Sequence, residues 1–216
     1  MYIEDISSGN VKSFKKLIKD IDPHIILKNF MMHFVENENI KCLKFFIKKY
    51  PEMINNQDEY GRTLLHYAVQ HSYEATSFLL DCNASTDIKD LNGYTPLLEF
   101  FENYYFEEYY NILELLIERV ASNNVNDVDE NGNGPLHHLA DNIKPENNTD
   151  LCSNDSENIL DIYENMFNLL VKHGAKPFLK NNEGDTPLMY CVKSEGYEGC
   201  EYKTSKIFEE WIIKMY

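Results

Sequence analysis

The sequence is poor in positive charge and contains almost no arginine. Its 216 residues include 20 basic and 36 acidic side chains, giving a formal net charge of −16, and its only arginines are Arg62 and Arg119. Nucleic acids and anionic lipid surfaces both require a basic protein face. The average charge therefore argues against both classes of partner, unless a local basic patch departs from it, and favours a partner protein with a basic surface.

Long apolar runs and cysteine motifs are also lacking. No apolar run approaches the roughly 20 residues that a membrane-spanning helix needs. The opening MYIEDISSGN lacks the basic and then apolar pattern of a signal peptide. The five cysteines are irregularly spaced, with no CxxC pair. We therefore expect a protein of a reducing compartment, the cytoplasm, in which the cysteines act as small core residues.

One short pattern recurs along the chain. The stretch DEYGRTLLHYA at 58–68 is followed by DLNGYTPLL at 90–98, DENGNGPLHHLA at 129–140 and NNEGDTPLMY at 181–190. The glycines of the pattern are 32, 39 and 52 residues apart. The first separation is close to a repeat of about 33 residues, and the other two equal that period with insertions.

A second element lies between these stretches. Segments 40–56, 73–90, 111–127 and 166–182 each begin with apolar residues at helical spacing, which predicts an amphipathic helix. The fourth helix pattern runs into His173-Gly174-Ala175, where Gly174 suits a left-handed helix C-cap.

Together the two elements resemble the ankyrin repeat, whose consensus runs Asp-x-x-Gly-x-Thr-Pro-Leu-His-x-Ala, followed by a turn and a second helix. Leu64 stands in the Pro position, Gly134 in the Thr position, and Leu98 and Met189 in the His position of their repeats. The resemblance is clear over 40–190 and weaker at both ends. It implies an all-α ankyrin-repeat solenoid of about six helix-turn-helix units with irregular ends.

The resemblance also gives the expected organisation of a single domain, 1–216. We expect a helical cap at 1–22, in which 9–21 forms a helix, and repeats bounded as 23–57, 58–89, 90–128 and 129–180, with a capping repeat at 181–216. The first helix of the repeat after the cap is expected at 23–37, and the last second helix at 206–216.

The residues of the pattern have structural explanations. Asp58 and Gly61 suit a hairpin turn, where glycine tolerates positive φ. Thr63 is placed to cap the first helix, and His66 can bond the backbone of the neighbouring unit. A Thr, His, Asp set also suggests a hydrolytic triad, but a triad would be a single set, whereas this one recurs with the repeat. We therefore predict structural roles and no enzymatic activity.

No other motif indicates chemistry. The pair His137-His138 has no Cys or carboxylate at ligand spacing, so no metal is expected. The stretch NGNGP at 131–135 lacks the lysine of a phosphate loop and the spacing of a dinucleotide site. The sequence predicts no cofactor.

Two insertions interrupt the repeats. The first, FENYYFEEYY at 101–110, lies between the helices of a unit. Its aromatics either pack beneath the helices or form an exposed acidic surface for a partner, and the sequence leaves both open. The second, at 141–161, is rich in Asn and Asp and predicts a surface loop.

The resemblance implies that protein partners are bound by turn tips and first-helix surfaces. Tyr60, Arg62 and Tyr94 are the strongest candidates, because Tyr and Arg dominate binding energy at interfaces. The full set of candidate partner-binding residues is Glu59, Tyr60, Arg62, Gln70, His71, Leu91, Asn92, Tyr94, Glu102, Asn103, Tyr105, Tyr109, Glu130, Asn131 and Asn133.

The insertions and the bias toward Asn, Ile, Lys and Tyr look like the ankyrin proteins of poxviruses, which act in host range and immune evasion. That resemblance implies a factor that binds a host signalling protein, in NF-κB or cell-death pathways, and sequesters it or presents it for degradation. Many such proteins recruit a cullin ubiquitin ligase through a C-terminal F-box-like segment, and none is visible up to Tyr216. An NF-κB-inhibitor mimic, a bacterial effector and a plain scaffold are the alternatives.

Overall fold

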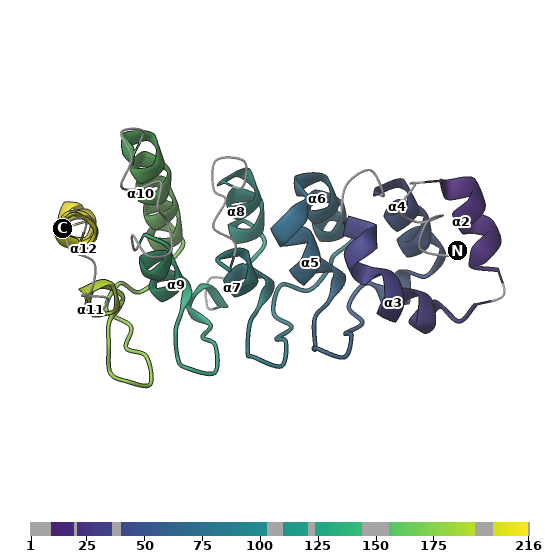
Figure 1. The fold of residues 1–216 in the computed structure, drawn as a ribbon, viewed down its shortest axis with the longest axis horizontal. Coiled ribbons are helices and arrows are strands. Elements are labelled where there is room, and N and C mark those ends of the chain that lie inside the picture. The colour runs from purple at the N-terminus through teal and green to yellow at the C-terminus, as the bar shows by residue number, and fades with distance from the viewer. Residues whose placement is uncertain are drawn as a thin grey trace. The chain divides into compact units, whose positions relative to one another are not determined.

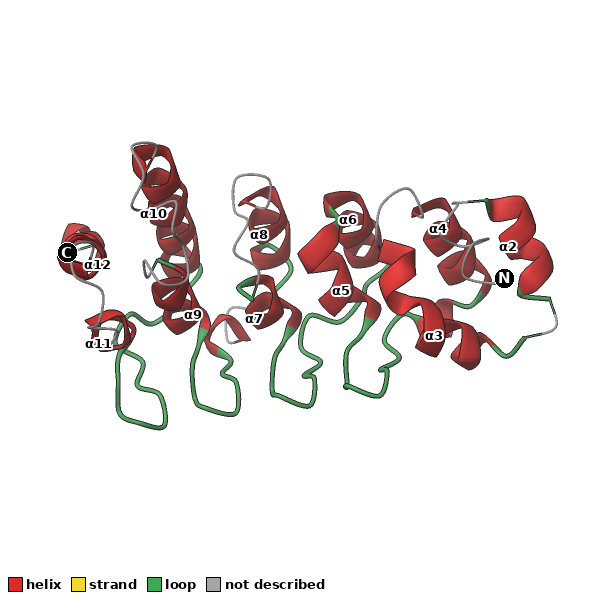
Figure 2. Ribbon diagram, in the orientation of Figure 1, coloured by secondary structure: helices red, strands yellow, loops and turns green. Residues whose placement is uncertain are grey.

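The computed structural model of the chain describes residues 10–19, 21–35, 40–102, 110–120, 124–143, 156–192 and 201–215. All regular structure among these residues is helical, which confirms the all-α fold class (Figures 1 and 2). The chain forms two compact units, unit 1 (Met1–Glu99) and unit 2 (Phe100–Tyr216).

Unit 1 is built from helix pairs. Its helices are α2 (Val11–Leu17), α3 (Pro23–Val35), α4 (Ile40–Lys49), α5 (Leu64–His71) and α6 (Tyr73–Asp81), with the 3₁₀ helix η2 (Pro51–Met53) after α4. Helix α3 packs against α4 and α5, α5 packs against α6, and α4 contacts both α2 and α6. Each helix therefore contacts its partner in the repeat and the equivalent helix next to it, as expected for stacked repeats.

The described helices of unit 2 follow the same plan. They are α8 (Tyr110–Ile117), α9 (Pro135–Asn142), α10 (Ser156–Lys172), α11 (Pro187–Val192) and α12 (Glu201–Lys214), with the 3₁₀ helix η3 (Asn124–Asn126). The short helix α7 (Pro96–Phe100) ends at the start of this unit. Helix α9 packs against α10 and α11, α10 against α8, and α11 against α12.

Aromatic clusters fill the core near each end of the chain. In unit 1 the ring of Phe34 lies 5.5 Å from that of Phe14 and 5.1 Å from that of Phe46, joining α2, α3 and α4. In unit 2 the ring of Phe167 lies 5.3 Å from Phe208 and 5.6 Å from Trp211. The terminal helices α2 and α12 are therefore anchored by buried aromatic side chains, which supply large apolar areas.

Two second helices end in the same left-handed cap. Gly174 has φ +97°, as its place in His173-Gly174-Ala175 predicts. Its N–H donates to the Val171 carbonyl (2.9 Å), and the Ala175 N–H donates to the Leu170 carbonyl (3.0 Å). These two bonds define a Schellman motif.

At the end of α6 the same motif is built on Asn83. Its φ is +61°, and it is the only described residue other than glycine with positive φ. The Asn83 N–H donates to the Leu80 carbonyl (3.0 Å), and the Ala84 N–H to the Leu79 carbonyl (2.9 Å). An asparagine therefore occupies the position that glycine normally takes.

The predicted loop at 141–161 is too long. Helix α9 continues to Asn142 and α10 begins at Ser156, so both ends of the predicted loop are helical. Asn142 is buried, and its side chain donates to the Phe101 carbonyl over 2.8 Å. The Tyr163 hydroxyl donates to the Asn142 carbonyl over 3.2 Å, so the end of α9 is packed rather than exposed.

The aromatic insertion at 101–110 is described only at its ends. Phe101 is buried against Phe100, with ring centroids 5.1 Å apart, and Glu102 is exposed. Tyr110 is half-buried at the start of α8. The remaining residues, 103–109, lie outside the described part of the chain, so the choice between buried and exposed aromatics stays open there.

Candidate protein-interaction site

The repeated turn is held by one side-chain oxygen. Asp58 Oδ1 accepts hydrogen bonds from the N–H groups of Tyr60 and Arg62, both at 2.9 Å. The Asp58 N–H in turn donates to the Arg62 carbonyl (2.9 Å), and the Gly61 N–H donates to the Asp58 carbonyl (3.1 Å). All four bonds are local, so the turn conformation is fixed by its own residues.

The same bonds recur in every described turn of this type. Oδ1 of the residue that begins the turn accepts from the residues two and four positions later, at 2.8 to 3.0 Å, in the turns beginning at Asp90, Asp129 and Asn181. The glycines of the four turns have φ between +77° and +86°. The sequence pattern and the local geometry therefore repeat together in both units.

Neighbouring turns are also joined to each other. In unit 1 the Leu91 N–H donates to the Tyr60 carbonyl over 3.0 Å. In unit 2 the Asn182 N–H donates to the Asn131 carbonyl, also over 3.0 Å. A Cβ added to Gly61 would lie 2.9 Å from the Leu91 nitrogen, closer than real Cβ contacts allow. Glycine at 61 is therefore required by both its φ and this close approach.

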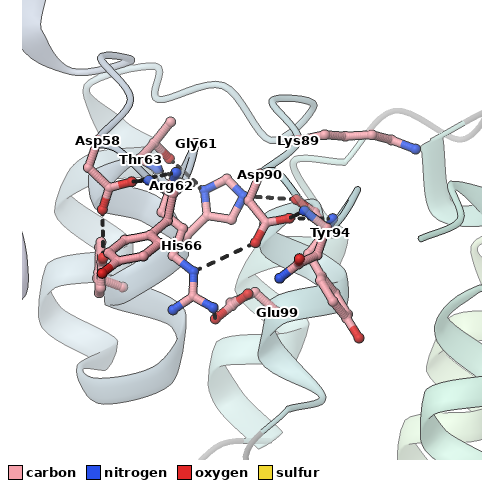
Figure 3. A network of polar contacts seen from close by, with 12 residues as sticks. Asp58, Gly61, Arg62, Thr63, His66, Lys89, Asp90, Tyr94 and Glu99 are labelled. Carbon is pink, nitrogen blue, oxygen red and sulfur yellow. Dashed lines mark hydrogen bonds and ion pairs between the residues drawn. The ribbon is translucent and has the colours of Figure 1, made fainter. Parts of the chain in front are cut away.

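His66 links its own helix start to the next turn (Figure 3). Its Nδ1 accepts from the Thr63 N–H (3.1 Å) and lies 2.9 Å from Thr63 Oγ1, and its Nε2 lies 3.0 Å from the Tyr94 carbonyl oxygen. A carbonyl only accepts, so Nε2 carries the proton and Nδ1 accepts. The ring is therefore neutral, and the bond that was predicted from His66 to the backbone of the neighbouring unit agrees with the structure. Thr63 is the N-cap residue of α5, but its hydroxyl lies against His66 Nδ1 and makes no side-chain cap hydrogen bond.

His137 repeats this arrangement in unit 2. Its Nδ1 accepts from the Gly134 N–H (3.2 Å), and its Nε2 lies 3.0 Å from the Asp185 carbonyl oxygen. Burial lowers the pKa of both His66 and His137 below its ordinary value, because the charged ring would be poorly solvated there. Both rings therefore belong to the fold in their neutral form.

The three residues that suggested a triad do not form one. His66 uses both ring nitrogens for Thr63 and Tyr94. Asp58 uses Oδ1 for two turn amides, and its Oδ2 accepts from the Tyr67 hydroxyl over 2.6 Å. Thr63 and His66 are buried, with 1% and 0% exposure. A nucleophile needs access to substrate, so these residues serve the fold.

Arg62 occupies a buried polar network rather than a free surface (Figure 3). Its Nη2 lies 3.2 Å from Glu99 Oε1 and its Nε lies 3.6 Å from Asp90 Oδ2. Both carboxylate side chains are only 1% exposed. Burial alone would lower the pKa of Arg62, but the charge of Glu99, with Tyr67, Asp90 and Asp58, raises it overall, so the guanidinium stays charged.

Gln70 and Tyr67 complete this network. The Gln70 amide donates to Glu99 Oε1 over 2.6 Å, and the Arg62 guanidinium lies 5.8 Å from the centre of the Tyr67 ring. Burial, together with the hydrogen bond to Asp58, raises the pKa of Tyr67. Arg62 and Gln70 were both expected to be exposed contact residues. They are half-buried instead, because they neutralise and solvate Glu99.

Asn133 was also expected at the surface, and that expectation is wrong. It is 7% exposed, and its side-chain oxygen accepts from the Asn181 amide over 2.9 Å. Its own amide lies 3.4 Å from Asp129 Oδ2. Asn133 therefore joins two turns of unit 2 through buried side chains. Sequence reasoning missed this because Asn181 lies 48 residues further along the chain.

His138 takes a place similar to that of Arg62. Its Nε2 lies 3.3 Å from Asp129 Oδ2 and its Nδ1 lies 3.9 Å from Glu102 Oε1. Burial works to raise the pKa of Asp129, but hydrogen bonds from His138 and from the Asn133 and Asn131 amides lower it overall. Within the described residues, no group of three His, Cys, Asp or Glu side chains is arranged to hold a metal.

The turn tips of unit 1 keep the predicted exposure. Tyr60 is 61% exposed and Leu91 is 73% exposed, and their backbones are hydrogen-bonded to each other. Glu59 and Asn92 beside them are also exposed, whereas Tyr94 is half-buried. The structure thus brings two large apolar side chains, from different repeats, to one edge of the unit.

The other candidates lie apart from this pair. In unit 2 the tip residues Glu130 and Asn131 are exposed, and Glu102 is exposed after α7. His71 is exposed at the end of α5. Asn103, Tyr105 and Tyr109 lie outside the described residues. Whether any of these residues binds a partner stays a prediction.

Two exposed apolar residues of unit 1, Ile25 and Tyr73, were not among the candidates from the sequence. Ile25 is 54% exposed on α3, one of the first helices. The signal was present, because the segment PHIILKNFMMHFV has more apolar residues than one buried helix face can hold.

Among the described helices, none is long and apolar enough to cross a membrane.

Comparison with known families agrees with this architecture. Residues 3–90 match the family model described as ankyrin repeats, in three copies. The turns beginning at Asp129 and Asn181 lie beyond the matched residues and have the same hydrogen bonds as those within them. Ankyrin repeats are generally protein–protein interaction modules and are typically not enzymes. The matched repeats and the all-helical fold, which is consistent with the predicted ankyrin-repeat solenoid, together support an ankyrin-repeat protein.

Proposed function

We propose that this protein is a non-enzymatic binding module whose turn tips in unit 1 contact a partner protein, with Tyr60 and Leu91 at the centre. The observation that carries the proposal is the exposure of these two side chains, 61% and 73%, on turns joined by a 3.0 Å backbone hydrogen bond. Large apolar side chains held together at a surface are typical of protein contacts.

The rigidity of the turns favours binding. In each tip, two backbone N–H groups donate hydrogen bonds to one side-chain oxygen, that of Asp58 in the first turn and that of Asp90 in the second. A partner therefore does not have to order the backbone, which reduces the entropic cost of association. Glu59 adds a carboxylate beside Tyr60, so a basic surface on the partner is favoured electrostatically.

The finer proposal concerns the kind of partner. Its support is the resemblance of the insertions and the residue bias to poxvirus ankyrin proteins. We propose a viral factor that acts in the host cytoplasm and binds a host signalling protein of the NF-κB or cell-death pathways. Sequestration of that protein is the proposed outcome. Its presentation to a cullin ubiquitin ligase would require an F-box-like segment beyond Tyr216. An NF-κB-inhibitor mimic, a bacterial effector or a plain scaffold would use the same tips.

The test is affinity capture from cell lysate with the full chain and its variant Tyr60→Ala/Leu91→Ala. Quantitative mass spectrometry compares the proteins retained by each. We expect the specific partner to be retained by the parent and lost with the double variant. Tyr73→Ala is the matched control, because Tyr73 is 51% exposed in the same unit but lies at the start of α6.

Equal capture by the parent and the Tyr60→Ala/Leu91→Ala variant would overturn the tip proposal. Loss of capture with Tyr73→Ala or Tyr110→Ala alone would place the contact on the helix–turn edge instead. Circular dichroism of each variant checks that its helices are intact. Tyr60 and Leu91 are mostly exposed, so their truncation should leave the fold unchanged.

A further inference from the structure

Positive charge is concentrated in one part of this acidic chain. Residues 10–50 contain nine lysines and four acidic residues, a net formal charge of +5, although the whole chain carries −16. Eight of these lysines lie on α2, on the turn that follows it and on α4: Lys12, Lys15, Lys16, Lys19, Lys41, Lys44, Lys48 and Lys49. All eight are exposed. The net charge of the whole chain is therefore negative, although the surface formed by these eight lysines, here called the lysine face, is positive.

The two helices that carry the lysines are packed together. The rings of Phe14 on α2 and Phe45 on α4 lie 6.3 Å apart, and Lys15 Nζ lies 4.7 Å from the centre of the Phe45 ring. Of the eight lysines, only Lys44 is in an ion pair with a described residue, Glu74, at 2.8 Å. The face therefore has an excess of positive charge that the described carboxylates do not neutralise.

An apolar groove lies beside this lysine face, between α4 and α6. Its volume is about 610 Å³, and Ile47, Ile54, Phe78 and Cys82 form its apolar lining. Lys44 and Lys48 also line it. Lys44 Nζ lies 5.7 Å from the centre of the Phe78 ring, so the apolar surface and the positive charge are in direct contact.

This combination indicates what the groove can hold. An apolar side chain gains free energy by leaving water for the lining. A carboxylate next to it on the same ligand would be attracted by Lys48 and by Lys44, whose present partner Glu74 is exposed and exchangeable. A basic ligand would meet the excess of lysine and be repelled. Asp81 is exposed and directly precedes the groove residue Cys82. Because its carboxylate repels other carboxylates, it limits how many acidic groups a ligand can place beside the groove.

We propose that the groove between α4 and α6 binds an acidic segment of a partner protein, with an apolar side chain of the segment in the groove and its carboxylates on Lys44 and Lys48. This surface consists of second helices and is separate from the turn tips. Figure 1 shows the turns of unit 1 on the side away from α4 and α6. The protein therefore has two contact surfaces of opposite electrostatic preference, and either can fail a test without affecting the other.

The probe is a short fluorescein-labelled peptide in which Leu and Phe are separated by pairs of Glu. Fluorescence anisotropy with the full chain gives Kd. We expect saturable binding that weakens as NaCl rises from about 0.05 M to about 0.3 M, because salt screens exposed charges. The variant Lys44→Glu/Lys48→Glu should bind about tenfold or more weakly. A control peptide with Gln for Glu should also bind weakly.

Cys82 reports whether the peptide occupies the groove. Its raised pKa, caused by burial and by Asp81, slows alkylation, so the reaction can be followed by mass spectrometry of the digested protein. We expect the acidic peptide to slow alkylation at Cys82 in proportion to the bound fraction. Cys42 is buried in the core and provides the internal reference, since its reaction requires opening of the fold.

The matched control is Lys180→Glu/Lys206→Glu, which gives the same net charge at exposed positions in unit 2. It should bind the peptide like the parent. Equal weakening by both double variants would show a general charge effect and overturn the proposal, as would unchanged alkylation of Cys82. Tighter binding of poly(U) RNA or of phosphatidylserine-containing vesicles than of the peptide would assign the lysine face to phosphate ligands and also overturn it.

Discussion

The Nε2 atom of His66 lies 3.0 Å from the carbonyl oxygen of Tyr94, 28 residues further along the chain. This contact joins the first helix of one repeat to the turn of the next, and it requires a neutral ring with the proton on Nε2. His137 makes the equivalent contact to Asp185 over 3.0 Å. Protonation would place a charge on a buried ring and remove the acceptor that holds the helix start.

The first prediction is that stability decreases as pH falls below about 6.5, the ordinary pKa of histidine. Folding lowers the pKa of His66 and His137, so the unfolded chain binds more protons between the folded and the unfolded pKa. Their stabilising contribution is therefore complete above about 6.5 and is lost as pH falls toward the folded pKa. Each histidine contributes a slope of up to about 1.4 kcal/mol per pH unit.

Urea unfolding at a series of pH values measures this slope. In the next repeat Leu98 occupies the position of His66, so His66→Leu is the natural control. It should lower stability above pH 7 by about 1–2 kcal/mol, through the lost hydrogen bonds, and flatten the pH dependence. An unchanged slope in His66→Leu would show that other groups cause the acid sensitivity.

The second prediction compares two glycines with the same backbone conformation. Gly61 and Gly184 have φ of +77° and +86°, so alanine at either position costs about 1 kcal/mol in backbone strain. A Cβ at Gly61 would also lie 2.9 Å from the Leu91 nitrogen, whereas a Cβ at Gly184 would meet nothing within 4 Å. Urea unfolding should therefore show a clearly larger loss for Gly61→Ala. Equal losses would mean that the neighbouring turn yields to the added methyl group.

The third prediction concerns Arg62, which lies against the buried carboxylates of Asp90 and Glu99. Its replacement in Arg62→Gln leaves both buried without their cation, and we expect a loss of at least about 2 kcal/mol in unfolding free energy. The side chain is 30% exposed, which keeps the loss below that of a fully buried pair.

Two comparisons test the origin of that loss. Arg119→Gln changes the only other arginine, which is exposed, and should alter stability by less than about 0.5 kcal/mol. Adding Glu99→Gln to Arg62→Gln removes one uncompensated charge and should recover part of the stability. A double variant as unstable as the sum of its single changes would show that the charges do not interact.

The fourth prediction is a stabilising change. Asn83 has φ +61° at the end of α6, where α10 has Gly174 with φ +97°. Asn83→Gly removes the strain of a side chain in the left-handed region, and Asn83→Ala increases it. We expect the thermal midpoint to be highest for Asn83→Gly, lower for the parent and lowest for Asn83→Ala. Each step should correspond to about 0.5–1 kcal/mol in the free energy of unfolding. A parent more stable than Asn83→Gly would indicate that the asparagine side chain contributes a bond of its own.

Local chemistry made much of this fold predictable from the sequence. The roles of Asp58 and Gly61 follow from residues within four positions of each other, and the structure agrees with both. Thr63 stands at the predicted N-cap position, but its hydroxyl lies against His66 Nδ1 instead of accepting from a helix amide. The start of α10 at Ser156 was missed although a signal exists. Leu160, Tyr163 and Phe167 continue the helical spacing toward the N-terminus, and the polar residues between them masked it.

The errors concern side chains whose partners lie in another repeat. Arg62 and Asn133 were expected at the surface because they lie between the fixed positions of the repeat pattern, which are the exposed positions in the ankyrin mode of binding. Arg62 instead meets Asp90 and Glu99, and Asn133 meets Asn181. The groove between α4 and α6 was not predicted from the sequence for the same reason. Its lining residues Ile47 and Phe78 belong to different repeats and come together only when the repeats stack. A net charge summed over the chain cannot show that its lysines gather on two neighbouring helices.

The residues that hold the turns differ from the tip residues proposed to contact a partner, so the choice of partner can change during evolution while the fold is kept. The hydrogen bonds described above hold each tip through one aspartate oxygen and backbone atoms, so these bonds do not depend on which side chains stand at positions 59, 60, 91 and 92. Mutational drift at these four positions can change the partner without passing through an unfolded intermediate. The same four positions can be randomised together as a library, and most members should fold, because Asp58, Gly61, Asp90 and Gly93 are left in place.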